Sequence, residues 1–201
     1  MPDIKSGICI VYIYLLNNKY NMRIILTGAQ STGKSVILKT LKEKYGDKFH
    51  YITEVVRNLA KTEGINVNEM GDEEGQNMIF STYEKLLGTQ ESYISDRGLT
   101  DVCAYSYYHA ETKEGMNHVA ADELARIKQF ISDNPDVLFF YFPIEFNVVD
   151  DGFRSTSEEF RHKVDQLILA VLKECKIPYI EVRGTVEERI AIIDRYLNHA
   201  E

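Results

Sequence analysis

Cysteine and proline are scarce in this sequence, with three cysteines and four prolines among 201 residues. Cys9, Cys103 and Cys175 lie far apart and form no C-x-x-C pair, which excludes a structural zinc site and a disulfide framework. The five histidines show no H-E-x-x-H or similar ligand spacing, so we expect no transition metal. Isolated cysteines of this kind are typical of reduced thiols, and we predict a cytoplasmic protein.

Positive charge is also in short supply. The 23 lysines and arginines are outnumbered by 31 aspartates and glutamates, which gives a formal net charge of −8. This balance argues against binding of nucleic acid through a broad basic face, although a local basic cleft stays open. We therefore predict a small molecule as the partner and do not expect nucleic acid in that role.

The apolar run at residues 8–16 is too short to cross a bilayer. It also lacks the features of a signal peptide, because charges of both signs precede it and no small-x-small cleavage site follows. We predict no membrane role for it. Met22 resembles a natural start, so we interpret residues 1–21 as an N-terminal extension, docked as an extra strand or poorly ordered, and residues 22–201 as one domain.

What the sequence does contain is a regular alternation of apolar runs and helical patterns. Such alternation is typical of an α/β protein with a parallel sheet. The predicted strands are residues 23–27, 50–53, 93–96, 137–142 and 178–182. The predicted helices are residues 34–45, 54–63, 73–90, 99–110, 119–132, 157–174 and 186–198. No repeat or Pro/Ser-rich linker interrupts the pattern, which favours a single core, since 44% of the residues are hydrophobic.

Residues 28–35 read G-A-Q-S-T-G-K-S, which matches the phosphate-binding P-loop pattern G-x-x-x-x-G-K-S/T. The match lies between a predicted strand and a predicted helix, where glycines let backbone N–H groups wrap a polyphosphate at a helix N-terminus. Lys34 would reach the β- and γ-phosphates, and the Ser35 hydroxyl would hold Mg²⁺. The predicted nucleotide-binding positions are Gly28, Ser31, Thr32, Gly33, Lys34, Ser35 and Val36. We predict a nucleoside triphosphate as the ligand, and the absence of a guanine-specific N-K-x-D motif favours ATP.

The metal ion of a P-loop site also needs an acid near the end of a neighbouring strand. Asp96 ends one predicted strand and is our candidate, with Glu145, which follows another strand, in reserve. Arg97 comes directly after Asp96, and Asp101 lies on the helix that follows. We interpret this Asp-Arg block as a metal and substrate site rather than as a strand-end acid beside a surface arginine.

Glu54 and Arg57 follow the second predicted strand, three residues apart and therefore on one face of a helix. The carboxylate could accept a proton from a substrate hydroxyl, and the arginine could bind an anionic group. An exposed salt bridge explains the same pair equally well, so both interpretations stay open.

The irregular segment 143–155 carries Arg154, which we expect to close over the transferred phosphate, because mobile loop arginines suit phosphoryl transfer. Arg161, on the helix that follows, is the weaker candidate for this role. Ser155 or Thr156 is expected to cap the start of that helix.

These motifs together resemble those of the P-loop nucleoside and nucleotide kinases. The matching elements are residues 28–35, Glu54-x-x-Arg57, Asp96-Arg97 with Asp101-x-x-Ala104-Tyr105, and Asp151-Gly152-x-Arg154. The Asp-Arg block is similar to the thymidylate-kinase signature. The Glu-x-x-Arg and Asp-Gly-x-Arg elements resemble the AAA-type ATPase group that includes the nicotinamide-riboside kinase domain of bacterial NAD regulators.

This resemblance implies a P-loop NTPase fold, a three-layer α/β/α sandwich whose mostly parallel five-stranded sheet has the P-loop strand at its centre. It implies that Glu54 contacts the acceptor or serves as the general base. It also implies that Asp96 and Arg97 lie near the metal and the acceptor, and that Arg154 belongs to a lid. Dimers are common in this group, so a homodimer is a further expectation.

The sequence departs from the thymidylate kinases at Gly98 and Asp101. An acid at position 101 would repel a substrate phosphate, which favours a nucleoside or another neutral hydroxyl acceptor. Our leading hypothesis is Mg²⁺-dependent phosphoryl transfer from ATP to a hydroxyl of a small nucleoside-, nucleotide- or nicotinamide-riboside-like acceptor. The alternatives are an NTP-binding or NTP-hydrolysing regulatory module and a kinase that acts on nucleic acid.

Overall fold

The computed structural model describes residues 22–148, 152–153 and 155–198 of the chain. Its centre is a five-stranded sheet of β1 (Arg23–Thr27), β2 (His50–Ile52), β3 (Tyr93–Asp96), β4 (Leu138–Tyr141) and β5 (Tyr179–Glu181). The strand order is β2-β3-β1-β4-β5, and every neighbouring pair is parallel. The predicted parallel sheet with a central P-loop strand is therefore confirmed. The extension expected at residues 1–21 lies outside the described residues.

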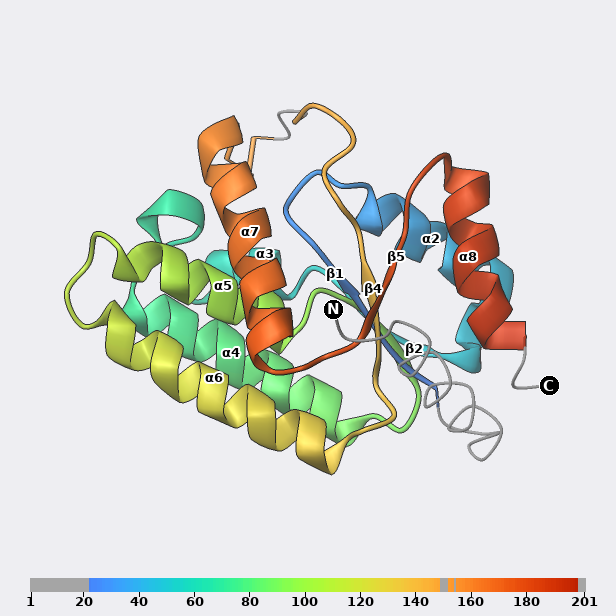
Figure 1. The fold of residues 1–201 in the computed structure, drawn as a ribbon, viewed down its shortest axis with the longest axis horizontal. Coiled ribbons are helices and arrows are strands. Elements are labelled where there is room, and N and C mark those ends of the chain that lie inside the picture. The colour runs from blue at the N-terminus through green and yellow to red at the C-terminus, as the bar shows by residue number, and fades with distance from the viewer. Residues whose placement is uncertain (1–21, 149–151, 154, 199–201) are drawn as a thin grey trace.

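Helices cover both faces of this sheet (Figure 1). The α-helices are α2 (Lys34–Tyr45), α3 (Val55–Thr62), α4 (Glu73–Thr89), α5 (Leu99–Ala110), α6 (Met116–Asp133), α7 (Glu158–Glu174) and α8 (Val186–Asn198). Short 3-10 turns occupy Gly46–Lys48 and Asn68–Met70. Helices α2 and α8 pack together on one face, whereas α4, α5, α6 and α7 form a contiguous layer on the other. The predicted three-layer sandwich is thus confirmed.

The alternation of side chains along β1 divides the core between these two layers. Ile24 and Leu26 belong to the cluster beneath α2 and α8, while Ile25 belongs to the cluster beneath α4 to α7. All three side chains are almost fully buried. A strand that is buried on both faces reads as a continuous apolar run, which is why the sequence identified it.

The start of α7 differs from the expectation. Its N-cap is Ser157, whose hydroxyl accepts a 3.2 Å hydrogen bond from the backbone N–H of Phe160. The caps expected at Ser155 and Thr156 are wrong, because the Ser155 hydroxyl is bonded to Glu69 and accepts from the Ser157 N–H instead. The Ser155 hydroxyl, which the local pattern favoured as a cap, is therefore engaged in a tertiary contact instead.

The parallel strands end at one edge of the sheet, which fixes the place of the functional residues. The register pairs Leu26 with Asp96 and Thr27 with Tyr141. The P-loop, Asp96 and the residues after β4 are therefore neighbours at this edge, where open α/β folds bind their ligands.

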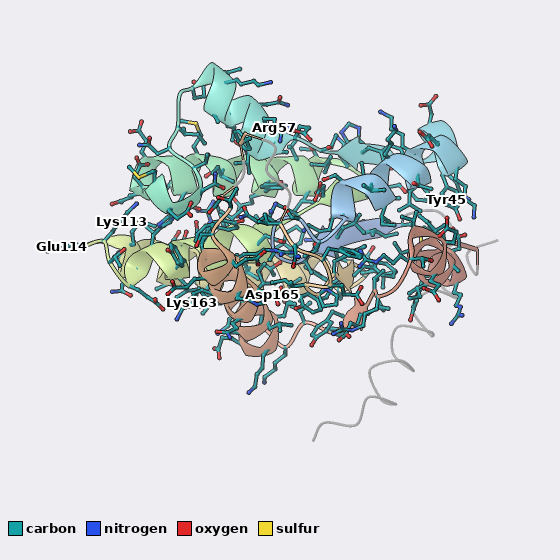
Figure 2. The ribbon with its side chains drawn as sticks, turned by 90° about the horizontal axis from the view of Figure 1, so that it is seen from above. Tyr45, Arg57, Lys113, Glu114, Lys163 and Asp165 are labelled. Carbon is teal, nitrogen blue, oxygen red and sulfur yellow. The ribbon has the colours of Figure 1, made fainter. Side chains whose placement is uncertain are left out.

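The helical layers extend well beyond the sheet. Lys113 and Glu114, in the turn between α5 and α6, lie at one end of the molecule, and Tyr45, the last residue of α2, lies at the other (Figure 2). Within the described ranges, no helix is both long and apolar enough to cross a membrane. Cys103 and Cys175 are both free thiols.

Candidate active site

The P-loop (residues 28–35) turns sharply from β1 into α2. Gly28 has a φ of 137°, and a Cβ there would lie 2.4 Å from the carbonyl oxygen of Phe142, so only glycine fits. Gly33 precedes α2 with a φ of 88° and offers no side-chain cap. The first turn of α2 contains no acidic residue. Its N-terminal amides and its dipole therefore favour an anion in front of the loop.

Lys34 lies inside the loop rather than in solvent. Its side chain is only 4% exposed. The ammonium donates to the carbonyl oxygens of Gly28 at 2.8 Å and Ala29 at 2.6 Å, and to the hydroxyl of Thr32 at 3.0 Å. The charge is thus held where the phosphates of a P-loop ligand are expected.

Ser35 and Asp96 meet across the gap between the P-loop and β3. The Ser35 hydroxyl donates a 2.8 Å hydrogen bond to Oδ2 of Asp96, and the backbone carbonyl of Asp96 accepts a 3.0 Å bond from the Tyr83 hydroxyl. Two hard oxygen donors side by side suit Mg²⁺, which usually takes one or two protein ligands and completes its shell with waters and phosphates. The residues present therefore fit the metal that the motif implies.

Asp101 is buried beneath the P-loop, with 1% of its surface exposed. Its carboxylate accepts hydrogen bonds from the backbone N–H of Gly28 at 3.2 Å and of Gly98 at 3.1 Å. Burial raises its pKa, and the nearby charges of Arg97 and Lys34 lower it in part. Asp101 thus ties the start of the loop to the start of α5, and its carboxylate is engaged by backbone amides.

A cavity of about 170 Å³ opens directly beside the P-loop. Its polar lining includes Glu54, Arg57, Asp96, Arg97 and Asp101, all of which the sequence had singled out. A cavity of about 150 Å³ is known to hold a benzene ring, so this one is large enough for an aromatic ring. Most of the predicted candidates are brought together here. Gly28 and the reserve acid Glu145 do not line the cavity, and Arg154 lies outside the described residues.

Backbone strain is concentrated around this cavity. Five described residues other than glycine have a positive φ, and four of them line the cavity. These four are Ser31, Glu54, Asn68 and Arg97. A left-handed backbone costs energy for any residue except glycine, and such strain is typical of functional sites. Arg97 has the largest φ of the four, at 77°.

Glu54 and Arg57 form an ion pair in the lining of the cavity. The Arg57 Nε atom lies 3.3 Å from the Glu54 carboxylate. The Arg57 guanidinium also lies over the ring of Phe153, 4.8 Å from its centre. The carbonyl oxygen of Phe153 accepts a 2.8 Å hydrogen bond from the Asn68 side chain. Asn68 and Phe153 also line the cavity, and the sequence pattern had not predicted either of them.

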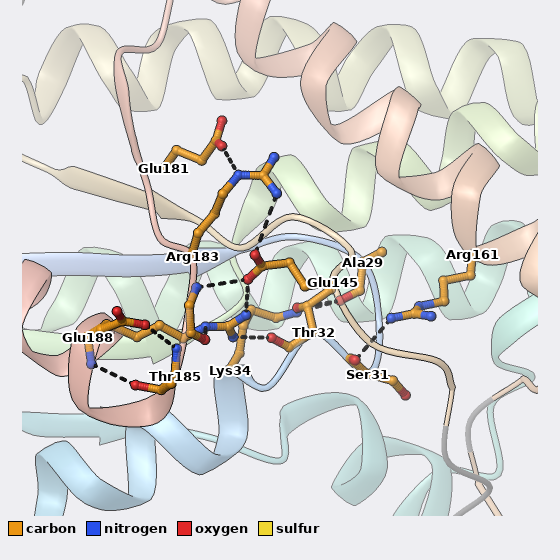
Figure 3. Close-up of polar contacts among 12 residues, drawn as sticks. Ala29, Ser31, Thr32, Lys34, Glu145, Arg161, Glu181, Arg183, Thr185 and Glu188 are labelled. Carbon is orange, nitrogen blue, oxygen red and sulfur yellow. Dashed lines mark hydrogen bonds and ion pairs between the residues drawn. The ribbon is translucent and has the colours of Figure 1, made fainter.

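Glu145, the reserve metal acid, is not among the residues that line the cavity, and Figure 3 shows it beside Arg183. Its carboxylate lies 2.5 Å from the Arg189 guanidinium, accepts a 3.1 Å bond from the Gly184 N–H and is 3.7 Å from Arg183. Asp96 is therefore the acid that is bonded to Ser35, and Glu145 is engaged by arginines.

Two buried arginines contact the P-loop backbone from α7 and α8. Arg161, which the sequence offered only as a weak lid candidate, bonds to the Gln30 and Ser31 carbonyls. Arg189, which the sequence did not single out, bonds to the Thr32 carbonyl. No motif spacing points to either contact, because each joins residues more than 100 positions apart.

A family model described as an AAA domain matches residues 23–189. The chain belongs to this AAA-domain family. The NadR protein in complex with NR has a similar structure, with a TM-score of 0.70 and 15% identity over 90% of this chain. The present chain covers only 52% of the length of that NadR chain.

Two further solved structures share the fold of this AAA domain. Deoxyadenosine kinase from M. mycoides has a TM-score of 0.59 and 18% identity over 90% of this chain and 100% of its own. Thymidylate kinase from Candida albicans has the same score and identity over 89% and 94%. No curated protein sequence matches. The family match and the shared fold confirm the predicted resemblance to P-loop kinases.

Proposed function

We propose that this AAA domain transfers the γ-phosphoryl group of ATP to a hydroxyl of a small nucleoside-like acceptor. The observation that carries the proposal is that the P-loop, the Ser35–Asp96 pair and Arg97 all border one cavity of ring-binding size. Beside the P-loop, the same cavity is lined by Glu54, Arg57 and Tyr105, which could hold an acceptor next to the phosphates. The names of the structures that share the fold, two kinases of nucleosides or nucleotides and an NR-bound protein, agree with such an acceptor.

The charges around the cavity favour a neutral acceptor over one that carries a phosphate. Arg57 is paired with Glu54 at 3.3 Å, and Arg97 lies 3.7 Å from Asp101. Among the described lining residues, each cavity arginine therefore has a carboxylate that offsets its charge. Asp101 thus disfavours an acceptor phosphate by offsetting the charge of Arg97. The sequence had suggested instead that Asp101 repels the phosphate directly.

Arg97 is the strongest candidate for contact with the reacting oxygens. Its Nη1 atom is buried and has no hydrogen-bond partner among the described residues. Its ion pair with Asp101, at 3.7 Å, is too long for a hydrogen bond, so an oxygen of a bound ligand would give this buried donor the bond that it lacks. In this proposal Arg97 and Lys34 neutralise the charge that develops on the transferred phosphoryl group. Arg154 keeps its proposed role as a lid arginine.

Asp96 and Ser35 would hold the metal, and Glu54 or Asp96 would orient the acceptor hydroxyl and take its proton. Mg²⁺ held by Asp96 and Ser35 would supply charge neutralisation for the phosphates. The rate would come mainly from positioning and from preorganised charge, because phosphoryl transfer asks little covalent chemistry of the protein.

The test is transfer from γ-labelled ATP to separate pools of nucleosides, nucleoside monophosphates, NR and short DNA, with Lys34→Ala as the control. We expect the label on a neutral nucleoside-like compound and no transfer by the control. Label on monophosphates would overturn the neutral-acceptor proposal, and label on DNA would favour a nucleic-acid kinase. Release of phosphate alone would favour a regulatory NTPase.

A further inference from the structure

Two arginines are the largest side chains in the fully buried part of the molecule. Arg161 on α7 is 1% exposed and Arg189 on α8 is 2% exposed. A buried guanidinium is costly unless its donors are bonded and its charge is paired. Both requirements are met here, and in both cases the P-loop backbone provides acceptors.

Arg161 reaches two successive carbonyl groups of the loop. Its Nε donates to the Gln30 carbonyl at 3.0 Å. Its Nη2 donates to the Ser31 carbonyl at 3.1 Å (Figure 3). The Glu158 carboxylate pairs with Nη1, at 3.2 Å and 3.1 Å to its two oxygens. The guanidinium is thus fixed by the carboxylate and turned toward the loop.

Arg189 takes the next carbonyl from α8. Its Nη1 donates to the Thr32 carbonyl at 2.6 Å, and its Nε donates to the Gly184 carbonyl at 2.9 Å. Its Nη2 lies 2.5 Å from the Glu145 carboxylate. A Cβ on Gly33 would lie 2.9 Å from Nη1, so the loop packs directly against this guanidinium.

Because the peptide bond is planar, these carbonyl contacts also determine where the neighbouring N–H groups of the P-loop point. In a trans peptide, the C=O of one residue and the N–H of the next lie in one plane and point in opposite directions. The carbonyls of Gln30, Ser31 and Thr32 each face an arginine, so the N–H groups of Ser31, Thr32 and Gly33 each point away from the arginine that holds the preceding carbonyl. We propose that Arg161 and Arg189 are positioning residues that aim these three amides at the donor polyphosphate.

The alternative is that the two arginines act only as positive charges near an anion. Lysine distinguishes the two cases, because it keeps the charge but has a single ammonium in place of the planar fork. The orienting role predicts that Arg161→Lys loses affinity, since one ammonium cannot reproduce the contacts to two carbonyls and a carboxylate. A purely electrostatic role predicts that the affinity stays.

The experiment measures the binding of Mg²⁺ with inorganic tripolyphosphate by calorimetry to the parent chain, Arg161→Lys and Arg189→Lys. Arg126→Lys is the matched control, because Arg126 pairs with Glu84 at 2.6 Å but contacts no P-loop atom among the described residues. We expect the dissociation constant to rise about 10- to 100-fold in the two P-loop variants, as for a lost charged hydrogen bond. The control should bind as the parent does. Dissociation constants of Arg161→Lys and Arg189→Lys within about twofold of the parent value would overturn the proposal.

A second measurement uses the parent chain alone, in case a variant does not fold. Tripolyphosphate should move the amide proton resonances of Ser31, Thr32 and Gly33 downfield, as expected for new hydrogen bonds to an anion. Resonances that stay in place at saturation would overturn the proposal. The inference rests on the proposed function only for its phosphate donor site. Tripolyphosphate binding without acceptor phosphorylation would therefore leave it standing while the kinase proposal fails.

Discussion

The hydroxyl of Ser35 donates a 2.8 Å hydrogen bond to Oδ2 of Asp96, which joins the last P-loop residue to the end of the neighbouring strand β3. The contact arises because β1 and β3 are parallel neighbours whose register places Asp96 beside Leu26. Neither residue alone marks a metal site. Their meeting places two hard oxygens beside a loop built for phosphates, and this supports the proposed binding of Mg²⁺.

Asp96→Asn should weaken the Mg²⁺ dependence of the reaction, because a neutral amide replaces the charged oxygen beside Ser35. We expect the Mg²⁺ concentration for half-maximal rate to rise about 10- to 100-fold, as for other losses around a metal. A Mg²⁺ titration of initial rates at saturating ATP measures this. An unchanged titration would transfer the role to Glu145, the acid held by Arg189 and Gly184.

Lys34→Ala should reduce kcat by about 10²- to 10³-fold or more, the usual cost of losing a preorganised charge at the reacting group. The variant also removes three hydrogen bonds inside the loop. Thermal unfolding therefore has to be followed alongside the rate. A variant that melts near the parent temperature and still turns over at a substantial rate would contradict the proposed role.

The fold was largely predictable because its signals are local. The alternation of apolar runs with helical periodicity does not depend on contacts between distant residues. The P-loop motif is contiguous, so its spacing alone placed β1 before it and α2 after it. The start of α7 was mispredicted because Ser155 was drawn into a contact with Glu69, which lies 86 positions away.

The candidate site was predictable only in part, for the same physical reason. Strand ends identified Glu54, Asp96 and Arg97, since parallel strands terminate at one edge. Arg189 escaped notice because its contact to Thr32 spans 157 positions and follows from how α8 packs on α2. The direction of the Asp101 carboxylate also depends on packing, and its bonds to backbone amides could not be read from helical spacing.

Gly28→Ala should destabilise the fold and abolish nucleotide binding. The added Cβ would lie 2.4 Å from the Phe142 carbonyl oxygen, on a backbone with a φ of 137°. We expect the free energy of unfolding to fall by about 2 kcal/mol or more, as for other overpacked sites. Gly88→Ala is the matched control, because Gly88 lies within α4 and has no atom within 4 Å of the added methyl. Chemical denaturation should show the control gaining about 0.5 to 1 kcal/mol, and equal losses in both variants would refute the packing argument.

Glu54→Gln tests the choice of general base. If Glu54 takes the proton of the acceptor hydroxyl, kcat should fall about 10²- to 10⁴-fold while the KM for ATP is unchanged, because Glu54 is paired with Arg57 rather than with a P-loop residue. Steady-state kinetics with the acceptor found in the transfer assay measures both constants. Glu63→Gln, at the end of the same helix, is the control. A variant with unchanged kcat would assign the role to Asp96.

Glu123 predicts a pH dependence of stability that is independent of activity. It is completely buried on α6, where the Ser106 hydroxyl is a polar neighbour that makes no hydrogen bond of good geometry to either carboxyl oxygen. Burial raises its pKa from 4.5 to about 8. Between these two values the folded state keeps a proton that the unfolded chain releases. The free energy of unfolding should therefore fall as the pH rises, by about 1.4 kcal/mol per pH unit from this group, and level off above the folded pKa.

Glu123→Gln removes this titration, because the amide stays neutral at every pH and nearly keeps the shape of the protonated acid. Denaturant unfolding at a series of pH values should show the parent losing stability relative to the variant as the pH rises toward the folded pKa of about 8. Glu114→Gln, in the exposed turn at the outer end of α5, is the control and should follow the parent (Figure 2). Parallel curves for the parent and Glu123→Gln would contradict the prediction. They would mean that the Glu123 carboxyl ionises as readily in the folded state as in the unfolded chain, which requires water or a rearrangement of α6 beside the carboxyl.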